Sequence, residues 1–542
     1  MGCSMACSAS LPRASTHDRL VVLALIGLIY LTGCADKLGP DFKEPSFDQT
    51  SRWLNAGNHE TRKGPAKSWW TLFDDPLLNR LIQRAYKNNL KVQTAALRII
   101  EARARLGIAR SFLFPQYGEF RADGLYEQLS EQSPYEQDLK DYSFPYYQTG
   151  FDTAWELDLW GKFRRGIEAS AAKLAQDTLE YDDILVSLIA EVANSYIQIR
   201  TFEERLRIAS ENAELQKRTF QIAESQFKNG ISTELDMQQA NSLQQKTLAE
   251  ITRIETGLRQ SRNTLCLLLG LPPTHIEKIL SETRGIPEIK EQNHFGIPAD
   301  LLRRRPDIRK AAFEAAAESA HIGIAQSELY PSLTLVGSVG FASGQVDAVD
   351  AMNAISPSGL AGKIGPTIRW PVLQFGRLKN NVRAQDARFQ SSLVNYKNKV
   401  LHALREVEDG LIEYRQSLAR VKRLESGVAS SHRAAELALV QYQNGLEDYI
   451  RVLNSELFLV EQQDMLLASK GDIARNLVLV YKALGGGWEI REGKPLIPAE
   501  TLKTMKERTD WGDLLDETPN QIFQFQEDPA NPDPIGGFEG IW

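Results

Sequence analysis

The chain has 542 residues, 42% of them hydrophobic and 25% charged, which is typical of a folded protein with room for more than one domain. Its formal net charge of −7 excludes a globally basic nucleic-acid binder. Three of its four cysteines, Cys3, Cys7 and Cys34, lie close to the N-terminus, so no disulfide framework is expected, and Cys266 is expected to be a small buried side chain.

The segment 1–33 has the features of a secretory signal peptide. Two arginines precede the apolar run Leu20–Leu31, which is too short to span a bilayer but suits the apolar region of a signal peptide. The run ends in Leu-Thr-Gly-Cys34, which resembles the lipobox of bacterial lipoproteins. The resemblance implies that Cys34 is lipidated and begins a lipid-anchored segment, residues 34–74. Ala35, where an inner-membrane lipoprotein has Asp, allows release to the outer membrane. The alternative is an ordinary signal peptide with a chance cysteine.

The body of the chain is duplicated. Gly107–Pro115 matches Gly323–Pro331 at six of nine positions, with an offset of 216 in the numbering. Trp155 and Trp370 are related by an offset of 215, and so are the Asn-Gly pairs that begin at Asn229 and Asn444. A constant offset over this distance indicates two structural repeats, which we place at 75–285 and 286–485. Residues 486–542, rich in proline, glycine and acidic side chains, are expected to form an extended C-terminal tail.

Each repeat is expected to begin with a helix that ends at Pro115 or Pro331, followed by two strands. Proline-free stretches follow at 162–229 and 377–444. Their apolar residues alternate at spacings of four and three, as in Tyr181, Leu185, Leu188 and Val192, which predicts long helices packed as left-handed coiled coils. At 1.5 Å per residue each helix would be about 100 Å long. The Asn-Gly pair predicts a reversal into an antiparallel partner helix.

The strand segments alternate strictly between apolar and polar residues. Phe151, Thr153 and Trp155 fall on one face, and Asp152 and Glu156 fall on the other. This pattern fits either a half-buried soluble sheet or a lipid-facing barrel with a wet interior. No apolar stretch after the signal peptide is long enough for a membrane-spanning helix, so a membrane crossing would require a closed barrel. Four strands cannot close a barrel alone, and the barrel interpretation therefore requires several copies.

Several motifs together resemble the outer-membrane factor family, the TolC-like exit ducts, in its lipoprotein branch that serves RND-type efflux. They are the Cys34 lipobox, Gly39-Pro40-Asp41-Phe42, Trp69-Trp70 with Phe73, the run 298–308, and the paired Asn-Gly turns. The resemblance implies a mainly α fold with β-strands, built from two tandem repeats. These form long antiparallel coiled-coil helices and four strands per protomer, which complete a trimeric 12-stranded β-barrel and an α-helical tunnel.

The family also implies a function and partners. The chain is expected to conduct small molecules passively to the exterior, from an inner-membrane RND-type transporter and a periplasmic adaptor, with outer-membrane lipid around it and no cofactor. A type I protein-secretion duct and a structural coiled-coil envelope lipoprotein are the alternatives. The lipid anchor resembles the efflux branch more, and the two-faced strands argue against a structural role alone.

The helix reversals are the candidate functional sites. By the resemblance, Asn229, Gly230, Asn444 and Gly445 form the periplasmic tip, where the adaptor docks. Many members carry gate-forming aspartates six or nine residues after the second glycine. This chain differs, and its candidate gate residues are Asp236, Glu447, Asp448, Arg451 and Asn454. We hypothesise an altered closed state in which Arg451 pairs with Asp236 or with Glu447.

Other motifs favour packing over chemistry. The histidines are sparse and none occur at i, i+4, and no phosphate loop or nucleophile elbow is present, so neither an enzyme nor a metal site is expected. Arg303–Arg305 reads either as an anion patch or as an ion-paired segment before a helix that starts near Pro306. Trp69 and Trp70 are expected to be buried, and Trp155 and Trp370 to lie in an interfacial belt or pack on the sheet.

Overall fold

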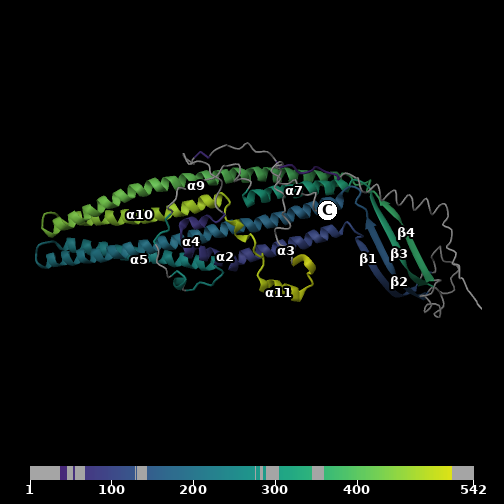
Figure 1. Cartoon of the computed structure of the whole chain (residues 1–542), viewed down its shortest axis with the longest axis horizontal. Helices are drawn as coiled ribbons and strands as arrows, with labels where there is room; N and C mark the ends of the chain where they lie inside the picture. The colour runs from purple at the N-terminus through teal and green to yellow at the C-terminus, as the bar shows by residue number, and fades with distance from the viewer. Residues whose placement is uncertain are drawn as a thin grey trace, which may run out of the picture.

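The computed structural model describes residues 37–44, 53–54, 67–128, 130, 143–274, 276–280, 285–288, 304–344 and 359–515. The predicted signal peptide and Cys34 lie outside this set. The molecule is long and narrow, with one sheet at one end and two helical hairpins reaching the other end (Figure 1). Within the described part of the chain, no helix combines the length and apolar character needed to cross a membrane.

The two repeats have the same order of elements, as the duplication predicts, except that α2 of the first has no counterpart among the described residues of the second. The elements of the first repeat are α2 (Pro76–Asn88), α3 (Leu90–Ser111), β1 (Tyr117–Gln128), β2 (Ser143–Glu156), α4 (Lys162–Lys228) and α5 (Glu234–Leu268). Those of the second are α7 (Pro306–Ser327), β3 (Ser332–Gly344), β4 (Leu360–Arg369), α9 (Arg377–Gln443) and α10 (Tyr449–Ala483). Helices α4 and α9 each contain 67 residues, and α5 and α10 each contain 35.

The helix that precedes the strands in each repeat ends earlier than its proline predicts. Helix α3 ends at Ser111 and α7 at Ser327, each four residues before the proline. The intervening backbone makes tight turns, in which the amides of Leu113 and Tyr330 donate to the carbonyls of Arg110 and Ser327. The residue before a proline disfavours helical backbone angles, and this restriction together with the turn ends the helix early.

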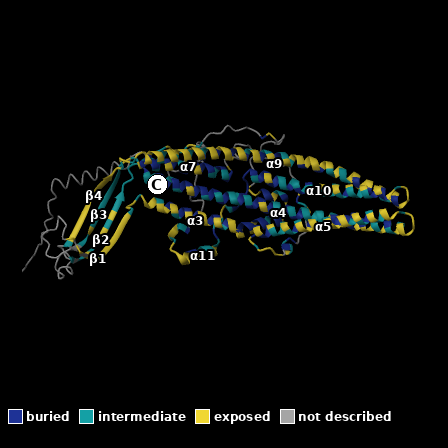
Figure 2. Cartoon of the chain, turned by 180° about the vertical axis from the view of Figure 1, so that it is seen from behind, coloured by how far each residue is buried: buried dark blue, intermediate teal, exposed yellow. Residues whose placement is uncertain are grey.

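Helix α4 is the centre of the packing, because it contacts α2, α3, α5, α7 and α10. The periodic residues Tyr181, Leu185, Leu188 and Val192 on it are all at most 5% exposed, which confirms the predicted seam. Burial is greatest in the middle of the molecule and falls toward both ends (Figure 2).

The two adjacent tryptophans lie in this central core, as expected. Trp69 and Trp70 are 0% and 3% exposed. The ring of Trp69 stacks on Tyr481 with centroids 5.5 Å apart, and its Nε1 donates to the carbonyl of Gly486 at 3.2 Å. These contacts connect the N-terminal segment to the end of α10.

The C-terminal segment is partly helical rather than extended. It contains the short η4 (Trp488–Arg491), α11 (Ala499–Arg508) and η5 (Gly512–Leu515). Arg491 makes a bidentate ion pair with Asp182 on α4, at 2.5 and 3.0 Å. The described tail therefore packs back onto the central helix, while residues 516–542 lie outside the described set.

The four strands form one antiparallel sheet in the order β1-β2-β3-β4. The register places Phe120, Phe151 and Val339 in one row, and Glu119, Asp152, Ser338 and Lys363 in the adjacent row. Since adjacent rows point to opposite faces, one face is apolar and the other is polar and charged, as the alternation predicts. Trp155 and Trp370 donate through Nε1 to the carbonyls of Leu113 and Leu329, each at 3.1 Å. They tie the sheet to the turns that follow α3 and α7.

Candidate functional site

Both helical hairpins reverse through the same backbone turn. Gly230 and Gly445 have φ angles of +73° and +70°, which a residue without Cβ adopts readily. Their amides donate to the carbonyls of Phe227 and Tyr442, at 2.9 and 3.0 Å. The preceding asparagines also close the helix, because Nδ2 of Asn229 donates to Ser225 O and Nδ2 of Asn444 donates to Val440 O. The predicted Asn-Gly reversals are therefore helix C-caps.

The helices that leave the two turns begin differently. In the first hairpin, Thr233 and Asp236 form a capping box, with each side chain accepting a hydrogen bond from the other's backbone amide. In the second hairpin, Asp448 occupies the cap position without a side-chain hydrogen bond, and the repeat offset makes Arg451 the equivalent of Asp236. Of the two hypothesised partners of Arg451, the structure pairs it with Glu447, with Nε and Oε2 3.2 Å apart.

All five candidate gate residues lie at or next to the turns. Asp448, Arg451 and Asn454 are exposed, whereas Asp236 and Glu447 are half-buried. The Glu447–Arg451 pair spans four residues, and Arg451 remains 69% exposed. Such an exposed pair contributes about 0.5 kcal/mol or less to stability. It therefore affects the net charge at the turn more than the stability of the fold.

A small core holds the two hairpins together just above the turns. Its buried members are Ala223 and Ala240 from the first hairpin, and Ala438, Tyr442, Tyr449 and Val452 from the second. The two tyrosine rings meet edge to face with centroids 5.4 Å apart. Burial raises the pKa of Tyr449 well above its usual range. Tyr442 falls within the predicted long helix 377–444, whereas Tyr449, which follows the turn, was not singled out from the sequence.

Polar contacts between α4 and α10 continue from this core toward the middle of the molecule. Thr219 donates to Glu456 at 3.0 Å, and Asn212 donates to Gln463 at 2.8 Å. Burial raises the pKa of Glu456, and the hydrogen bond from Thr219 opposes this shift. Both side-chain polar atoms of the buried Gln216 lack a hydrogen-bond partner. The contact between the two hairpins therefore includes the half-buried carboxyl group of Glu456 and the buried amide of Gln216, which lacks hydrogen-bond partners.

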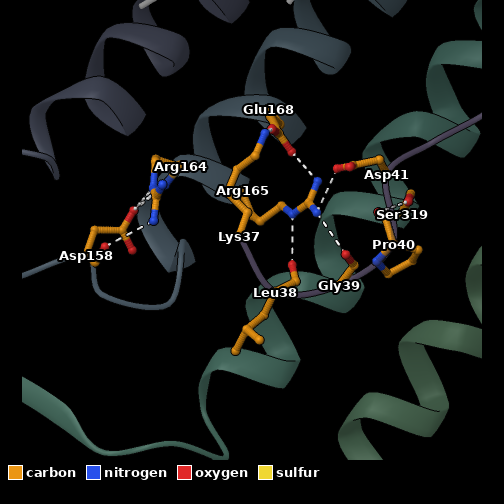
Figure 3. A network of polar contacts seen from close by, with 10 residues as sticks. All are labelled: Lys37, Leu38, Gly39, Pro40, Asp41, Asp158, Arg164, Arg165, Glu168 and Ser319. Carbon is orange, nitrogen blue, oxygen red and sulfur yellow. Dashed lines mark hydrogen bonds and ion pairs between the residues drawn. The ribbon is translucent and has the colours of Figure 1, made fainter. Parts of the chain in front are cut away.

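At the sheet end, a buried arginine clamps the N-terminal strap, residues 37–44 (Figure 3). Arg165, only 3% exposed, donates through Nε to the carbonyl of Leu38 and through Nη2 to that of Gly39, both at 2.9 Å. It also pairs with Glu168 at 2.7 Å and with Asp41 at 2.9 Å. The motif Gly39-Pro40-Asp41 that the sequence singled out is thus the part of the strap that this guanidinium binds.

The strap needs glycine where it crosses α7. Gly39 has a φ of +88°, and a Cβ there would lie 2.6 Å from the Cα of Gly323. Farther along, the rings of Phe42 and Phe389 are 6.4 Å apart, and the hydroxyl of Tyr396 donates to Glu44 at 2.8 Å. The strap therefore contacts α4, α7 and α9, and so joins the two repeats.

The last arginine of the run before α7, Arg305, is ion-paired. Arg305 pairs with Asp307 at 2.9 Å and Glu406 at 2.8 Å, and donates to the carbonyl of Ala483 at 2.6 Å. Helix α7 begins at Pro306, as expected, and Arg303 lies outside the described residues. Among the described residues, no group of three His, Cys, Asp or Glu side chains is arranged to hold a metal ion.

The paired repeats, the reversals and the two-faced sheet agree with the comparison to known families. A family model described as outer membrane efflux protein matches residues 81–271 and 297–486, one segment in each repeat. The chain belongs to the outer membrane efflux protein family. It is an outer-membrane channel of the kind through which a tripartite pump, with an inner-membrane transporter and a periplasmic adaptor, exports small molecules.

Individual relatives match over nearly their whole length. The chain is 30% identical to the solvent efflux pump outer membrane protein SrpC of Pseudomonas putida, over 87% of this chain and 99% of that protein. It is 27% identical to nodulation protein T of Rhizobium leguminosarum bv. trifolii, covering 85% and 96%. The solved outer-membrane channel OprN aligns with a TM-score of 0.78 and 30% identity, over 83% of this chain and 99% of that one.

Proposed function

We propose that three copies of this chain form a closed duct, anchored by lipid on Cys34, that conducts small molecules passively and performs no chemistry itself. The observation that carries this proposal is the sheet, whose two faces differ in polarity and whose apolar face exposes large side chains. On the apolar face, Phe120, Phe151, Ile364 and Ile368 are 52% to 91% exposed. A water-facing surface of this kind is unfavourable for a soluble monomer.

The sheet has the properties of one third of a membrane barrel. Its apolar face suits lipid, and its other face carries the charged side chains of Glu119, Arg121, Asp152 and Lys363, which suit a wet interior. Strands β1 and β4 are open edges, and open edges cannot remain unpaired in hydrocarbon. With four antiparallel strands, β4 runs opposite to β1, so copies can join edge to edge around an axis.

The strap supports the proposed lipid anchor. Leu38 donates its amide to Trp160 O at 3.2 Å, at the junction between the sheet and the helices. Cys34 precedes Lys37 by three residues, a separation that spans at most about 11 Å. Acyl chains on Cys34 would therefore enter the membrane close to the base of the sheet. A relative from Salmonella typhimurium, 29% identical to this chain, is described as a probable outer membrane lipoprotein.

The opposite end is the proposed docking and gating end. Exposed Asn229-Gly230 and Asn444-Gly445 turns form the tips that an adaptor would contact. Around the tip axis, three copies of the Glu447–Arg451 pair would replace a ring of free carboxylates. Because each pair is close to neutral, the closed tip should select cations less than an acidic ring would.

Planar-bilayer recording of the purified full-length protein tests the proposed function. We expect SDS-resistant trimers and stable single-channel conductance. A detergent-solubilised protein that stays monomeric and passes no ions through the bilayer would exclude the duct.

The gate is tested by Arg451→Ala. Removal of this cation leaves Glu447 unpaired, so cation selectivity should increase relative to the unmodified channel. Arg433→Ala is the matched control, since Arg433 makes a similar exposed pair with Glu436 at 3.2 Å on α9, away from the turn. Unchanged conductance and selectivity in Arg451→Ala would remove the gate hypothesis.

A further inference from the structure

One joint between the two repeats is visible inside a single chain. Strand β2 of the first repeat pairs with β3 of the second, for example Tyr146 with Gly344 and Phe151 with Val339. In every such pair the two residue numbers add to 490. The two repeats therefore meet in one defined register. Strands β1 and β4, which are the repeat equivalents of β3 and β2, form the two open edges of the sheet.

The offset between equivalent strand residues is 215. Trp155 and Trp370, which are related by this offset, make equivalent hydrogen bonds to the turns that precede β1 and β3. Paired residue numbers add to 271 between β1 and β2, as in Phe120 with Phe151, and to 701 between β3 and β4, as in Val339 with Gly362. These totals differ by 430, twice 215, so β1 corresponds to β3 and β2 to β4 with one common offset.

We infer that the joint between neighbouring copies repeats this internal joint, so that β4 pairs with β1 of the partner subunit in the register whose residue numbers add to 490. The inference rests on the proposed trimer and specifies its seam. In this joint β4 occupies the position of β2, and its residue numbers are 215 higher. Strand β1 of the partner subunit occupies the position of β3, and its residue numbers are 215 lower. The two residue numbers of each pair therefore still add to 490. Gly365 then lies opposite Leu125 of the partner subunit, and Thr367 opposite Asp123 of the partner subunit.

The charges at the two edges favour their association. Among the described side chains of the polar face, β4 carries Lys363 and Arg369, while β1 carries Glu119, Arg121 and Asp123, giving charges of +2 and −1. Arg369 lies opposite Arg121 of the partner subunit, which is already paired with its own Asp123 at 2.5 Å. The carboxylates of Glu119 and Asp123 of the partner subunit flank Arg369 on both sides, within reach of its long side chain.

The helices give independent support. Leu179 on α4 and Phe313 on α7 pack in one buried cluster between the repeats and are 3% and 4% exposed. Their equivalents, Val394 on α9 and Leu97 on α3, follow from the offsets 215 and 216 and are 57% and 38% exposed. Repetition of the internal joint would place Leu97 of the partner subunit against Val394 and cover both side chains.

Cysteine pairs on the polar face test the register. Each full-length double variant carries Leu125→Cys with one of three partners: Lys363→Cys, Gly365→Cys or Thr367→Cys. A Cβ at Gly365 meets no atom within 4 Å in its own chain, so this position accepts a side chain. Directly opposed residues have Cα atoms about 5 Å apart and diagonal ones about 7–8 Å, whereas a disulfide requires about 4.4–6.8 Å.

We expect Leu125→Cys/Gly365→Cys to form covalent trimers on non-reducing gels in at least fivefold excess over the other two pairs. The unmodified protein, whose free cysteine within the described residues is the buried Cys266, is the control. If another pair links best in a conducting trimer, or if none links, the register is wrong while the duct stands. Absence of both trimers and conductance in the unmodified protein would instead refute the proposed function.

Discussion

The clamp on the strap gives a quantitative prediction. Arg165→Ala removes the charged donors from the carbonyls of Leu38 and Gly39, while Glu168 keeps its ion pair with Lys37. A hydrogen bond to a charged group contributes about 1.5–3 kcal/mol, and breaking a buried ion pair costs about 3–5 kcal/mol, so we expect a loss of about 3–5 kcal/mol of local stability. At about 1.4 kcal/mol per tenfold change, the strap should open a hundredfold to a few thousandfold more often.

Hydrogen–deuterium exchange of the peptide covering residues 37–44 measures this opening. In Arg165→Ala, the amide of Leu38, which donates to Trp160 O, should exchange at least a hundredfold faster. Asp41→Ala is the control within the same network, because Asp41 is 77% exposed and its ion pair contributes little. It should change exchange by less than about fivefold. Equal exchange in Arg165→Ala and the unmodified protein would refute the clamp.

Two further predictions concern the tip. Burial raises the folded-state pKa of Glu456, so its ionisation lowers the stability of the protein as the pH rises above the usual carboxyl range. Glu456→Gln should therefore raise the Tm at pH 8 and leave the Tm unchanged near pH 4. The control Glu461→Gln, at an exposed position, should change neither value. Gly445→Ala should lower the stability of the tip by about 1–2 kcal/mol, because the backbone has a positive φ there. Gly166 lies inside α4 with open space where a Cβ would be, so Gly166→Ala should stabilise the protein by about 0.5–1 kcal/mol. Denaturant unfolding measures both effects. A destabilised Glu456→Gln at pH 8, or equal effects of the two glycine changes, would contradict these assignments.

The duplication explains why so much of the fold could be predicted. Each element occurs twice, so a weak pattern in one repeat is supported by its equivalent in the other. Helix α9, for instance, has a less regular apolar series than α4, yet both contain 67 residues. The strand faces followed from strict alternation, and the reversals followed from glycine in the Asn-Gly pairs.

The strap clamp could not be predicted, because it depends on contacts between distant parts of the chain. Arg165 and Gly39 are 126 residues apart, and no periodic pattern relates them. The helix ends were wrong by four residues, because a tight turn separates the end of each helix from its proline. In the tail, the abundance of proline and acidic residues concealed α11, whose ten residues follow Pro498.

The partner of Arg451 did have a local signal in the sequence. Glu447 precedes it by four residues, the favourable spacing on a helix. The pattern Thr233-x-x-Asp236 matches a capping box, which occupies the other candidate carboxylate.

The length of α9 makes the molecule a lever. The contact between Glu44 and Tyr396 holds this helix near the sheet, and the helix then continues without a break from Tyr396 to the turn at Asn444. At 1.5 Å per residue this arm is about 70 Å long. A tilt of about 5° at the held end would displace the turn by about 6 Å, roughly the diameter of a small solute. A small angular change near the strap would therefore displace the far turn by several ångströms.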